Sequence, residues 1–276
     1  MKIEAAGRTD VGRRRKINED NLWISPDGGL LVVADGMGGH DAGEVASRIV
    51  VSVIRDYLTG GAPLDLTEKM RLDVLGKVRS PAGSRAGGED ETTQMDLEHP
   101  MLNSVSAAIT HANHHVYQRN QERQYADGTG MGTTIVGFWL PANSEYGVVF
   151  HVGDCRLYLY RDGRMQQLTR DHTLYQEWHD RGAVGNPPKR NIILRAVGPW
   201  QNVTADVKLQ RVRCGDVYLL CSDGLTEMVN DHEIECVMAK SQHGSLHNAC
   251  RYLVGKANER GGTDNITVVL ARTTPG

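Results

Sequence analysis

Short apolar runs with strand character recur along this chain, and several of them lie directly beside an aspartate. The runs are rich in Val, Ile, Leu and Tyr, which is typical of buried strands. They cover residues 30–34, 133–140, 148–152, 157–160, 217–221 and 266–271. Asp35 follows the first run, Asp223 lies just after the fifth, and Asp264 lies just before the last. The pattern predicts a sheet-rich domain that carries carboxylates near several strand ends.

Segments with helical periodicity separate these runs. Apolar spacing predicts long helices over residues 42–58 and 102–123, a short helix over 172–181, and a further helix over 245–259. Asp162-Gly163 predicts a tight turn between two strands, 157–161 and 164–169. Because strands and helices do not alternate strictly, we expect an α+β layered domain.

Residues 60–99 differ from the rest of the chain. A helix-like piece over 64–78 is followed by a small, polar, Gly-rich stretch over 80–94. We interpret the segment as a flexible insertion in a single domain that spans residues 1–276. It could be a linker without function or a partner-binding loop.

Bulk composition excludes several classes of protein. The 276 residues have a formal net charge of −3, which argues against nucleic acid as a partner. No apolar run is long enough to span a membrane, and the N-terminal residues lack a signal-peptide core, so a cytoplasmic location is expected. The five cysteines are odd in number and lack C-x-x-C spacing, which indicates neither a disulfide framework nor a zinc site.

Four dipeptides that contain acidic residues carry the strongest chemical signal. They are Glu19-Asp20, Asp35-Gly36, Asp223-Gly224 and Asp264-Asn265. Several carboxylates on one rim of a sheet repel one another unless cations neutralise them. Hard oxygen ligands favour Mg²⁺ or Mn²⁺ over zinc. Two such ions can activate a shared water and stabilise an in-line phosphoryl displacement.

A basic run, Arg13-Arg14-Arg15-Lys16, directly precedes the first acidic pair. A guanidinium can hold two phosphate oxygens at once, so this run could bind a phosphate that enters the acidic site. A solvated surface is the alternative interpretation.

The chain resembles a known family, the type 2C (PPM) metal-dependent Ser/Thr protein phosphatases of bacteria. The matching stretches are TDVGRRRKINEDN (9–21), VVADGMGGHDAGEVAS (32–47), GMGTTIVG (130–137), HVGDCRLYLYRDG (151–163), LTRDHT (168–173), CGDVYLLCSDGLTEMV (214–229) and GGTDNITVVLAR (261–272). They follow the family's order. The resemblance implies a four-layer α-β-β-α sandwich with two central, mostly antiparallel sheets and a metal site at one end.

The resemblance also implies a role for each site residue. Asp35 would bridge two metals, and the carbonyl of Gly36 would contact the second. Arg15 would bind the substrate phosphate, so Arg15 and Asp35 are the expected catalytic residues. The remaining expected ligands are Asp223 and Asp264 on the first metal, and Glu19, with its neighbour Asp20, at the second. A third, weaker metal would use Asp154 with Asp223, and Asp127 is the candidate for its other ligand.

The implied reaction is direct hydrolysis of phosphoserine or phosphothreonine by a hydroxide that bridges two Mn²⁺ or Mg²⁺ ions. No phosphoenzyme is expected. Met37 stands where eukaryotic members carry a histidine proton donor. We therefore favour a metal-bound water over His40 as the acid.

Two other functions remain open, an inactive homologue that binds phosphoproteins and a hydrolase of small phosphate esters. The expected partners are phosphorylated proteins, including a cognate Ser/Thr kinase and its substrates, and the protein is expected to be a monomer. Residues 174–193 correspond to the family's flap and should contribute to substrate selection. The histidines at 111, 114, 115 and 172 are interpreted as structural or surface residues.

Overall fold

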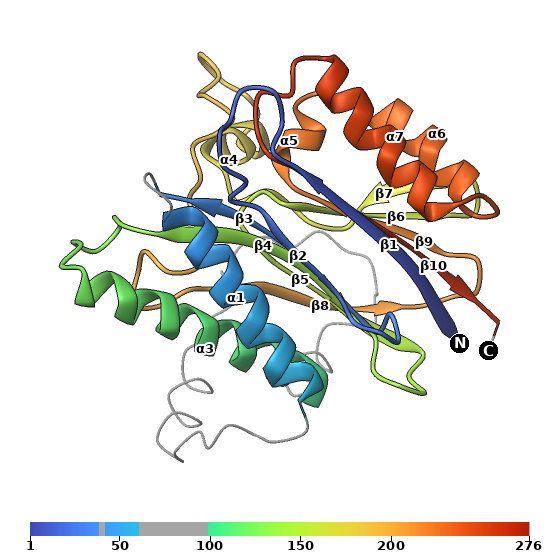
Figure 1. Cartoon of the computed structure of the whole chain (residues 1–276), viewed down its shortest axis with the longest axis horizontal. Coiled ribbons are helices and arrows are strands. Elements are labelled where there is room, and N and C mark those ends of the chain that lie inside the picture. Colours follow the sequence, from blue (N-terminus) through green and yellow to red (C-terminus); the bar gives the residue numbers. More distant parts are fainter. Residues whose placement is uncertain (39–41, 61–98, 276) are drawn as a thin grey trace.

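Two five-stranded sheets pack face to face in the computed structural model, which describes residues 1–38, 42–60 and 99–275 (Figure 1). One sheet has the strand order β2-β3-β4-β5-β8 and the other β1-β10-β9-β6-β7. All strand pairs are antiparallel. The strands are β1 (Lys2–Asp10), β2 (Asn21–Ile24), β3 (Leu30–Met37), β4 (Gly132–Trp139), β5 (Tyr146–Val152), β6 (Arg156–Arg161), β7 (Arg164–Gln167), β8 (Asp206–Arg211), β9 (Val217–Cys221) and β10 (Ile266–Thr274).

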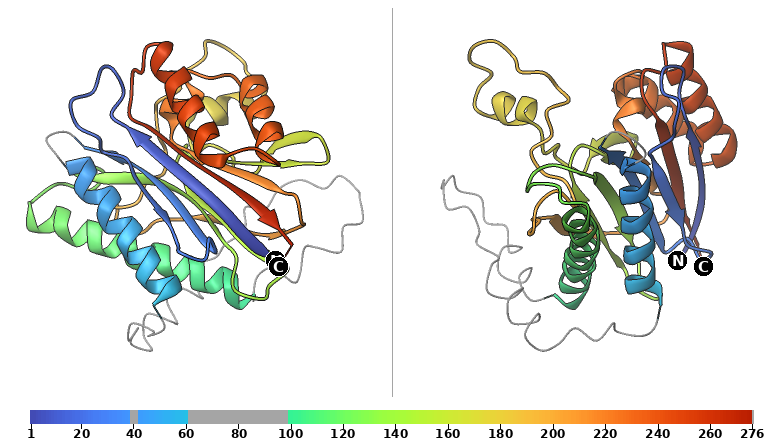
Figure 2. Two further views of the ribbon diagram at one scale, coloured as in Figure 1. Left: turned by 45° about the vertical axis from the view of Figure 1, so that its right-hand side comes forward. Right: turned by 60° about the vertical axis from the view of Figure 1, so that its left-hand side comes forward.

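Helices cover the outer face of each sheet, which completes the predicted four layers. Helices α1 (Ala42–Thr59) and α3 (Pro100–Glu122) lie on the β2-β3-β4-β5-β8 sheet. Helices α5 (Asp223–Thr226), α6 (Asp231–Ser241) and α7 (Leu246–Glu259) lie on the other sheet. Helix α4 (Leu174–Asp180) and the loop after it stand away from this body (Figure 2).

Residue alternation along β3 explains why its sequence is a continuous apolar run. Leu30 and Val32 belong to the core under α1 and α3, whereas Leu31 and Val33 belong to the core between the sheets. Successive side chains of a strand point to opposite faces, so a strand buried on both faces needs apolar residues throughout. By the same alternation, Asp35 lies on the face that points between the sheets.

The local setting of two predicted aspartates differs from the expectation. Asp35 was expected at the end of a strand, but β3 continues to Met37 and Asp35 lies inside it. Asp223 was expected near a strand end; it lies two residues after β9 and is the first residue of the short helix α5, with Ser222 as N-cap. Ladder and helix bonds therefore fix both carboxylates more firmly than a loop would.

The predicted helices and strands are confirmed, within one to three residues at their ends, for the part of the chain that the structure describes. Strands β1, β2 and β8 and helices α5 and α6 were not predicted. Residues 61–98, which hold most of the expected insertion, and His40 lie outside the described residues. None of the described helices is long and apolar enough to cross a membrane.

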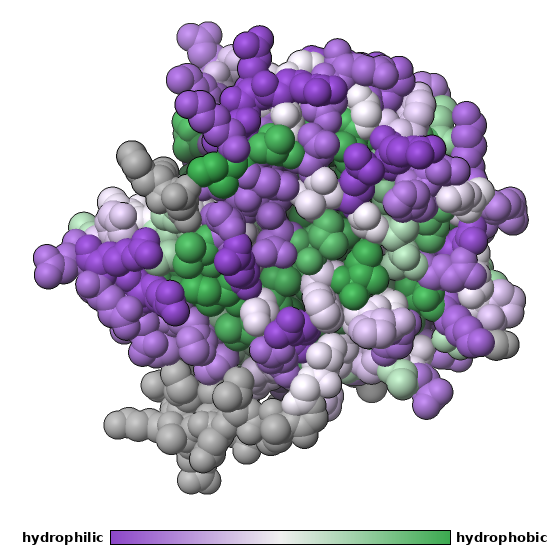
Figure 3. All heavy atoms as spheres, in the orientation of Figure 1, coloured by the Kyte–Doolittle hydropathy of each residue, from purple (hydrophilic) through white to green (hydrophobic). Residues whose placement is uncertain are grey.

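The two ends of the chain lie side by side, because β1 and β10 are paired along their whole length, from Lys2 opposite Thr274 to Asp10 opposite Ile266 (Figure 1). The face that carries α1, β1 and α7 is mixed, with small apolar groups between hydrophilic ones (Figure 3).

Two glycine-to-alanine substitutions should have opposite effects on stability. A Cβ at Gly137 in β4 would lie 2.0 Å from the Phe150 ring, whereas a Cβ at Gly255 in α7 would meet nothing within 4 Å. We expect Gly137→Ala to lower the free energy of unfolding by about 1–3 kcal/mol through overpacking. Gly255→Ala should raise it by about 0.5–1 kcal/mol through helix propensity. Urea denaturation measures both, and equal effects would contradict the packing of β4 on β5.

Candidate metal centre

Carboxylates from distant parts of the chain converge where the two sheets meet. Burial raises the pKa of Asp35 well above its ordinary value, and the charges of four other aspartates raise it further. Those four are Asp20, Asp223, Asp154 and Asp264. Burial, and then the charges of Asp154 and Asp264, likewise raise the pKa of Asp223. The structure thus brings together the three aspartates on which the predicted site depends, Asp35, Asp223 and Asp264.

Two oxygens in this group have unused acceptor capacity. Asp20 Oδ1 and Asp223 Oδ1 are buried and have no hydrogen-bond partner among the described residues. A buried, unpaired carboxylate oxygen is costly, and a bound cation removes that cost. The candidate donors are all oxygens, from carboxylates and from the Gly36 carbonyl, which fits Mg²⁺ or Mn²⁺.

Two hydroxyl groups fix Asp20, one from Ser222 just after β9 and one from Thr267 in β10. Its Oδ2 accepts hydrogen bonds from Ser222 Oγ at 2.8 Å and Thr267 Oγ1 at 2.6 Å. Burial nevertheless raises the pKa of Asp20 to about 6, because desolvation outweighs these two bonds. Both hydroxyls bind Oδ2 and leave Oδ1 without a hydrogen-bond partner among the described residues.

Glu19 lies in the loop between β1 and β2 and contacts the start of α1. Its Oε1 accepts from the Gly43 N–H at 3.2 Å, and its carbonyl accepts from Ser47 Oγ at 2.6 Å and the Gly36 N–H at 3.2 Å. A Cβ at position 36 would lie 2.6 Å from the Glu19 carbonyl oxygen and 2.2 Å from that of Gly43. Only glycine therefore allows the two chain segments to approach so closely.

Arg15 is the cation at this site. Its Nη2 donates to Asp264 Oδ2 at 2.6 Å, and its Nη1 lies 4.0 Å from Glu19 Oε2. The hydrogen bond with Asp264 is the main reason why the pKa of Arg15 is raised. The side chain is 48% exposed, so it can also meet a ligand from solvent.

Asp154 lies next to the main group, since its charge acts on Asp35 and Asp223. Burial, and then the charge of Asp171, raise its pKa to about 6. Asp171 is itself paired with Arg156, whose Nη2 lies 2.7 Å from Asp171 Oδ2. Asp127 is engaged elsewhere, because it accepts from Tyr117 Oη at 2.8 Å. A part for Asp127 in a third metal site remains a prediction.

Asn265 is a site residue whose role the sequence did not reveal. Its side-chain oxygen accepts from the Glu19 N–H at 2.8 Å, and its Nδ2 donates to the carbonyls of Val11 and Ile17 at 2.9 and 3.0 Å. These bonds cross more than 240 residues of sequence. The only available signal was its place directly after Asp264.

A second group of metal-ligand types lies at the base of the flap. His151, His172 and Asp206 offer ligand atoms within 4.8 Å of one another. The two rings are stacked at 4.5 Å and 19°, so a single ion cannot lie in both ring planes. Arg195 Nη1, at 2.9 Å from Asp206 Oδ1, already supplies a positive charge. We interpret this group as structural, as predicted for His172.

His172 connects the flap to the Asp154 loop. Its ring Nδ1 accepts from the Gly153 N–H at 3.1 Å, and its main-chain N–H donates to the Gly153 carbonyl at 2.9 Å. The Leu194 N–H donates to the His172 carbonyl at 2.8 Å. His172 therefore holds both ends of the flap against the residue that precedes Asp154.

His111 and His115 form a pair on α3. Their Nε2 atoms lie 3.2 Å apart, and among the described residues no third His, Cys, Asp or Glu completes a group around them. The five cysteines are free. Burial raises the pKa of the Cys155 thiol well above its usual value, which makes it a poor nucleophile.

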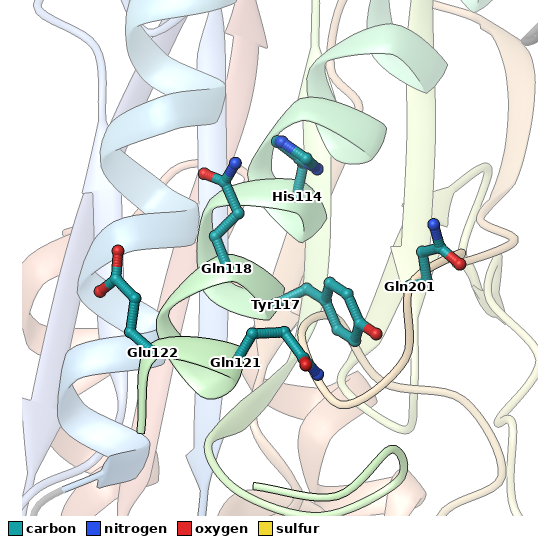
Figure 4. Close-up of a pocket in the computed structure, with 6 residues that line it drawn as sticks. All are labelled: His114, Tyr117, Gln118, Gln121, Glu122 and Gln201. Carbon is teal, nitrogen blue, oxygen red and sulfur yellow. The ribbon is translucent and has the colours of Figure 1, made fainter. Parts of the chain in front are cut away.

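A pocket of about 300 Å³ lies on α3, away from the carboxylates. Figure 4 shows side chains of the last turns of α3 around it, with Gln201 on the opposite side. Its lining contains none of the clustered aspartates, so we do not associate it with the metal centre.

Comparisons with known proteins point in one direction. A family model described as protein phosphatase 2C matches residues 13–253. The serine/threonine protein phosphatase PstP of Mycobacterium tuberculosis is 35% identical over 274 residues, covering 98% of this chain and 45% of the relative. The serine/threonine phosphatase stp of Listeria welshimeri is 33% identical, covering 97% of this chain and 95% of the relative. This chain thus spans about half the length of the mycobacterial relative.

Solved structures agree with the sequence relatives. The crystal structure of the PstP catalytic domain in complex with two manganese ions superposes with a TM-score of 0.75 at 30% identity, covering 99% of each chain. A further crystal structure of PstP has a TM-score of 0.76 at 29% identity and covers both chains completely.

The raised pKa values predict an unusual pH dependence for the metal-free protein. Asp20 and Asp154 have pKa values of about 6 in the folded protein, against about 4 in an unfolded chain. The folded state therefore binds more protons than the unfolded state between these values, and its stability should fall as pH rises from about 4 to about 6. Thermal unfolding in EDTA at several pH values measures this slope. Mn²⁺ at pH 7.5 should raise the melting temperature.

Two variants isolate this effect from other titrations. Asp20→Asn should flatten the slope. Asp206→Asn should not flatten it, because the pKa of Asp206 is lowered, to about 2, rather than raised. The main cause is its hydrogen bond with His172. The carboxylate of Asp206 thus stabilises the fold above about pH 4, and its loss should lower the neutral-pH melting temperature. An Asp20→Asn slope equal to that of the wild type would contradict the assignment.

Proposed function

This chain belongs to the protein phosphatase 2C family, and from that premise we propose that it hydrolyses phosphoserine and phosphothreonine in proteins with two Mn²⁺ or Mg²⁺ ions. The observation that carries the proposal is the convergence of Asp20, Asp35, Asp223 and Asp264 beside Arg15, with two carboxylate oxygens left unpaired.

We assign the metal-holding role to the carboxylates of Asp35, Asp223, Asp264, Glu19 and Asp20, together with the Gly36 carbonyl. When bound, such ions lower the pKa of a shared water and offset negative charge on the phosphoryl group. Asp154, with Asp223, would hold a third ion, and Asp127 is the candidate for a further ligand.

Arg15 orients the substrate phosphate. In the structure its guanidinium donates to Asp264, and the same planar fork can grip two phosphate oxygens. Asp264 would hold a metal ion in this proposal, and Arg15 N–H groups not bonded to Asp264 would hold the phosphate. The guanidinium stays charged at any working pH, since the pKa of Arg15 is raised.

The proton for the leaving serine or threonine oxygen comes from water in this proposal. Met37 lies next to the site glycine Gly36 and has no proton to donate. The buried Cys155 keeps its proton at neutral pH, because burial and nearby carboxylates raise its pKa. No covalent phosphoenzyme is required.

The flap supports a protein substrate. Tyr175, Trp178 and Arg190 form one cluster on it, with the Arg190 guanidinium 4.6 Å from the centre of the Tyr175 ring. Burial, then the charge of Asp264, raises the pKa of Glu227 near the centre, while Arg15 and Arg190 lower it. We propose that Arg190 and the aromatic rings beside it contact a phosphorylated segment of chain.

The wider assignments are part of the same proposal. We propose one domain over residues 1–276 that acts as a monomer in the cytoplasm. Its substrates would be phosphoproteins, including a cognate Ser/Thr kinase and the targets of that kinase.

Asparagine in place of either of two proposed metal-ligand carboxylates should abolish the activity. With Mn²⁺, the wild-type protein should release phosphate from a phosphothreonine peptide, and Asp35→Asn or Asp223→Asn should lower kcat/KM by at least about a thousandfold, because each removes a ligand charge. Asp162→Asn is the matched control. Asp162 lies in the β6–β7 turn at a φ of 52°, which asparagine tolerates, and its activity should equal that of the wild type.

Two further measurements separate the alternative functions. Full activity in excess EDTA would refute the metal requirement, and weak Mn²⁺ binding by calorimetry would favour an inactive phosphoprotein-binding homologue. A kcat/KM that is higher for a sugar phosphate than for the phosphopeptide would favour a hydrolase of small esters.

A further inference from the structure

We propose that Asn265 is the positioning residue for Arg15, and that its side chain sets the affinity of the site for phosphate. This inference rests on the proposed function. The three side-chain hydrogen bonds of Asn265 all go to main-chain groups of the loop that carries Arg15. Val11 and Ile17, which accept two of them, lie on either side of Arg15, and Glu19 follows.

The loop and Asn265 belong to opposite ends of the chain but lie side by side. Figure 1 shows the loop between β1 and β2 next to the segment between α7 and β10. The Arg13 N–H donates to the Gly262 carbonyl at 2.7 Å. At Gly12, where φ is +81°, a Cβ would lie 2.2 Å from the Asp264 carbonyl oxygen. Backbone contact therefore anchors the start of the loop, whereas the Asn265 side chain spans it.

An amide is the side chain that this place requires. Asn265 is 3% exposed, and its one carbonyl meets an N–H while its NH₂ group meets two carbonyls. A carboxylate of the same shape could accept from Glu19 but could not donate to Val11 or Ile17. Loss of the amide would leave two carbonyls without these donors and release the span of loop between them.

The expected consequence falls on phosphate binding. The Arg15 side chain contacts Asp264 and Glu19, which are also proposed ligands, so its reach depends on the path of the loop. A loop that samples several paths must be ordered when phosphate binds, which weakens affinity. Asp264 keeps its own support, because its Oδ1 accepts from the main-chain N–H of residue 265 at 2.8 Å, which does not depend on the side chain there.

The test uses inorganic phosphate as an inhibitor of the Mn²⁺-loaded enzyme acting on a phosphothreonine peptide. Asn265→Ala should raise the phosphate inhibition constant and KM about tenfold, within the range found when a supporting residue is lost, and should change kcat much less. In an Arg15→Ala background the same substitution should change the inhibition constant less than about twofold, because coupled residues are not additive.

Asn113 provides the matched control. It is 1% exposed, accepts from the Gly198 N–H at 2.7 Å, and donates to the carbonyls of Trp200 and Gln201 at 3.0 Å each. It thus makes the same pattern of bonds away from the Arg15 loop. Asn113→Ala should lower the melting temperature to a similar extent and leave the phosphate inhibition constant unchanged.

Specific results would overturn the inference. It fails if folded Asn265→Ala binds phosphate like the wild type, or if its effect persists in full in the Arg15→Ala background. Should the alanine variant not fold, the isosteric Asn265→Asp is measured in the same way and against the same criteria. A wild-type protein that is inactive with Mn²⁺ would instead refute the proposed function, so the two failures are distinguishable.

Discussion

Mutual repulsion among the carboxylates gathered between the two sheets is the constraint that shapes this end of the molecule. Each of these groups pays a desolvation penalty when it is ionised, and each neighbouring negative charge adds to it. The charges of four other aspartates raise the pKa of Asp35. A fold with only stability to satisfy would have apolar residues here. A bound cation offsets this desolvation and repulsion. The same arrangement that destabilises the fold without a cation therefore favours cation binding.

The rest of the structure holds these groups in place against their repulsion. Hydrogen bonds from Ser222 and Thr267 fix Asp20, the ladder of β3 fixes Asp35, and the first turn of α5 fixes Asp223. These supports belong to both sheets. Rigid strands packed over a continuous core can store the strain of several close charges, which flexible loops could not.

The sequence allowed prediction of the elements that are buried on both faces. The runs that became β3, β9 and β10 are almost entirely apolar, because each lies between a helix layer and the other sheet. Strands β1 and β8 escaped prediction because they are edge strands of mixed polarity, half exposed to solvent. Helix α5 escaped because Asp-Gly is normally a turn signal.

Within the site, the carboxylates themselves could be read from the motifs, but their supports could not. The bonds of Asn265 to Val11 and Ile17 have no local signature, since they join groups that become neighbours only after folding. The same holds for the link from Thr267 to Asp20. Sequence patterns report which groups do chemistry, whereas tertiary contacts decide how those groups are aimed.

The pairing of β1 with β10 has a consequence for how the protein is made. The hydrogen bond between Asp20 and Thr267 joins residues 247 positions apart, and the one between Glu19 and Asn265 joins residues 246 positions apart. A ribosome delivers the first partner of each pair long before the second. The nascent chain therefore carries an unassembled centre until β10 has been synthesised and has paired with β1.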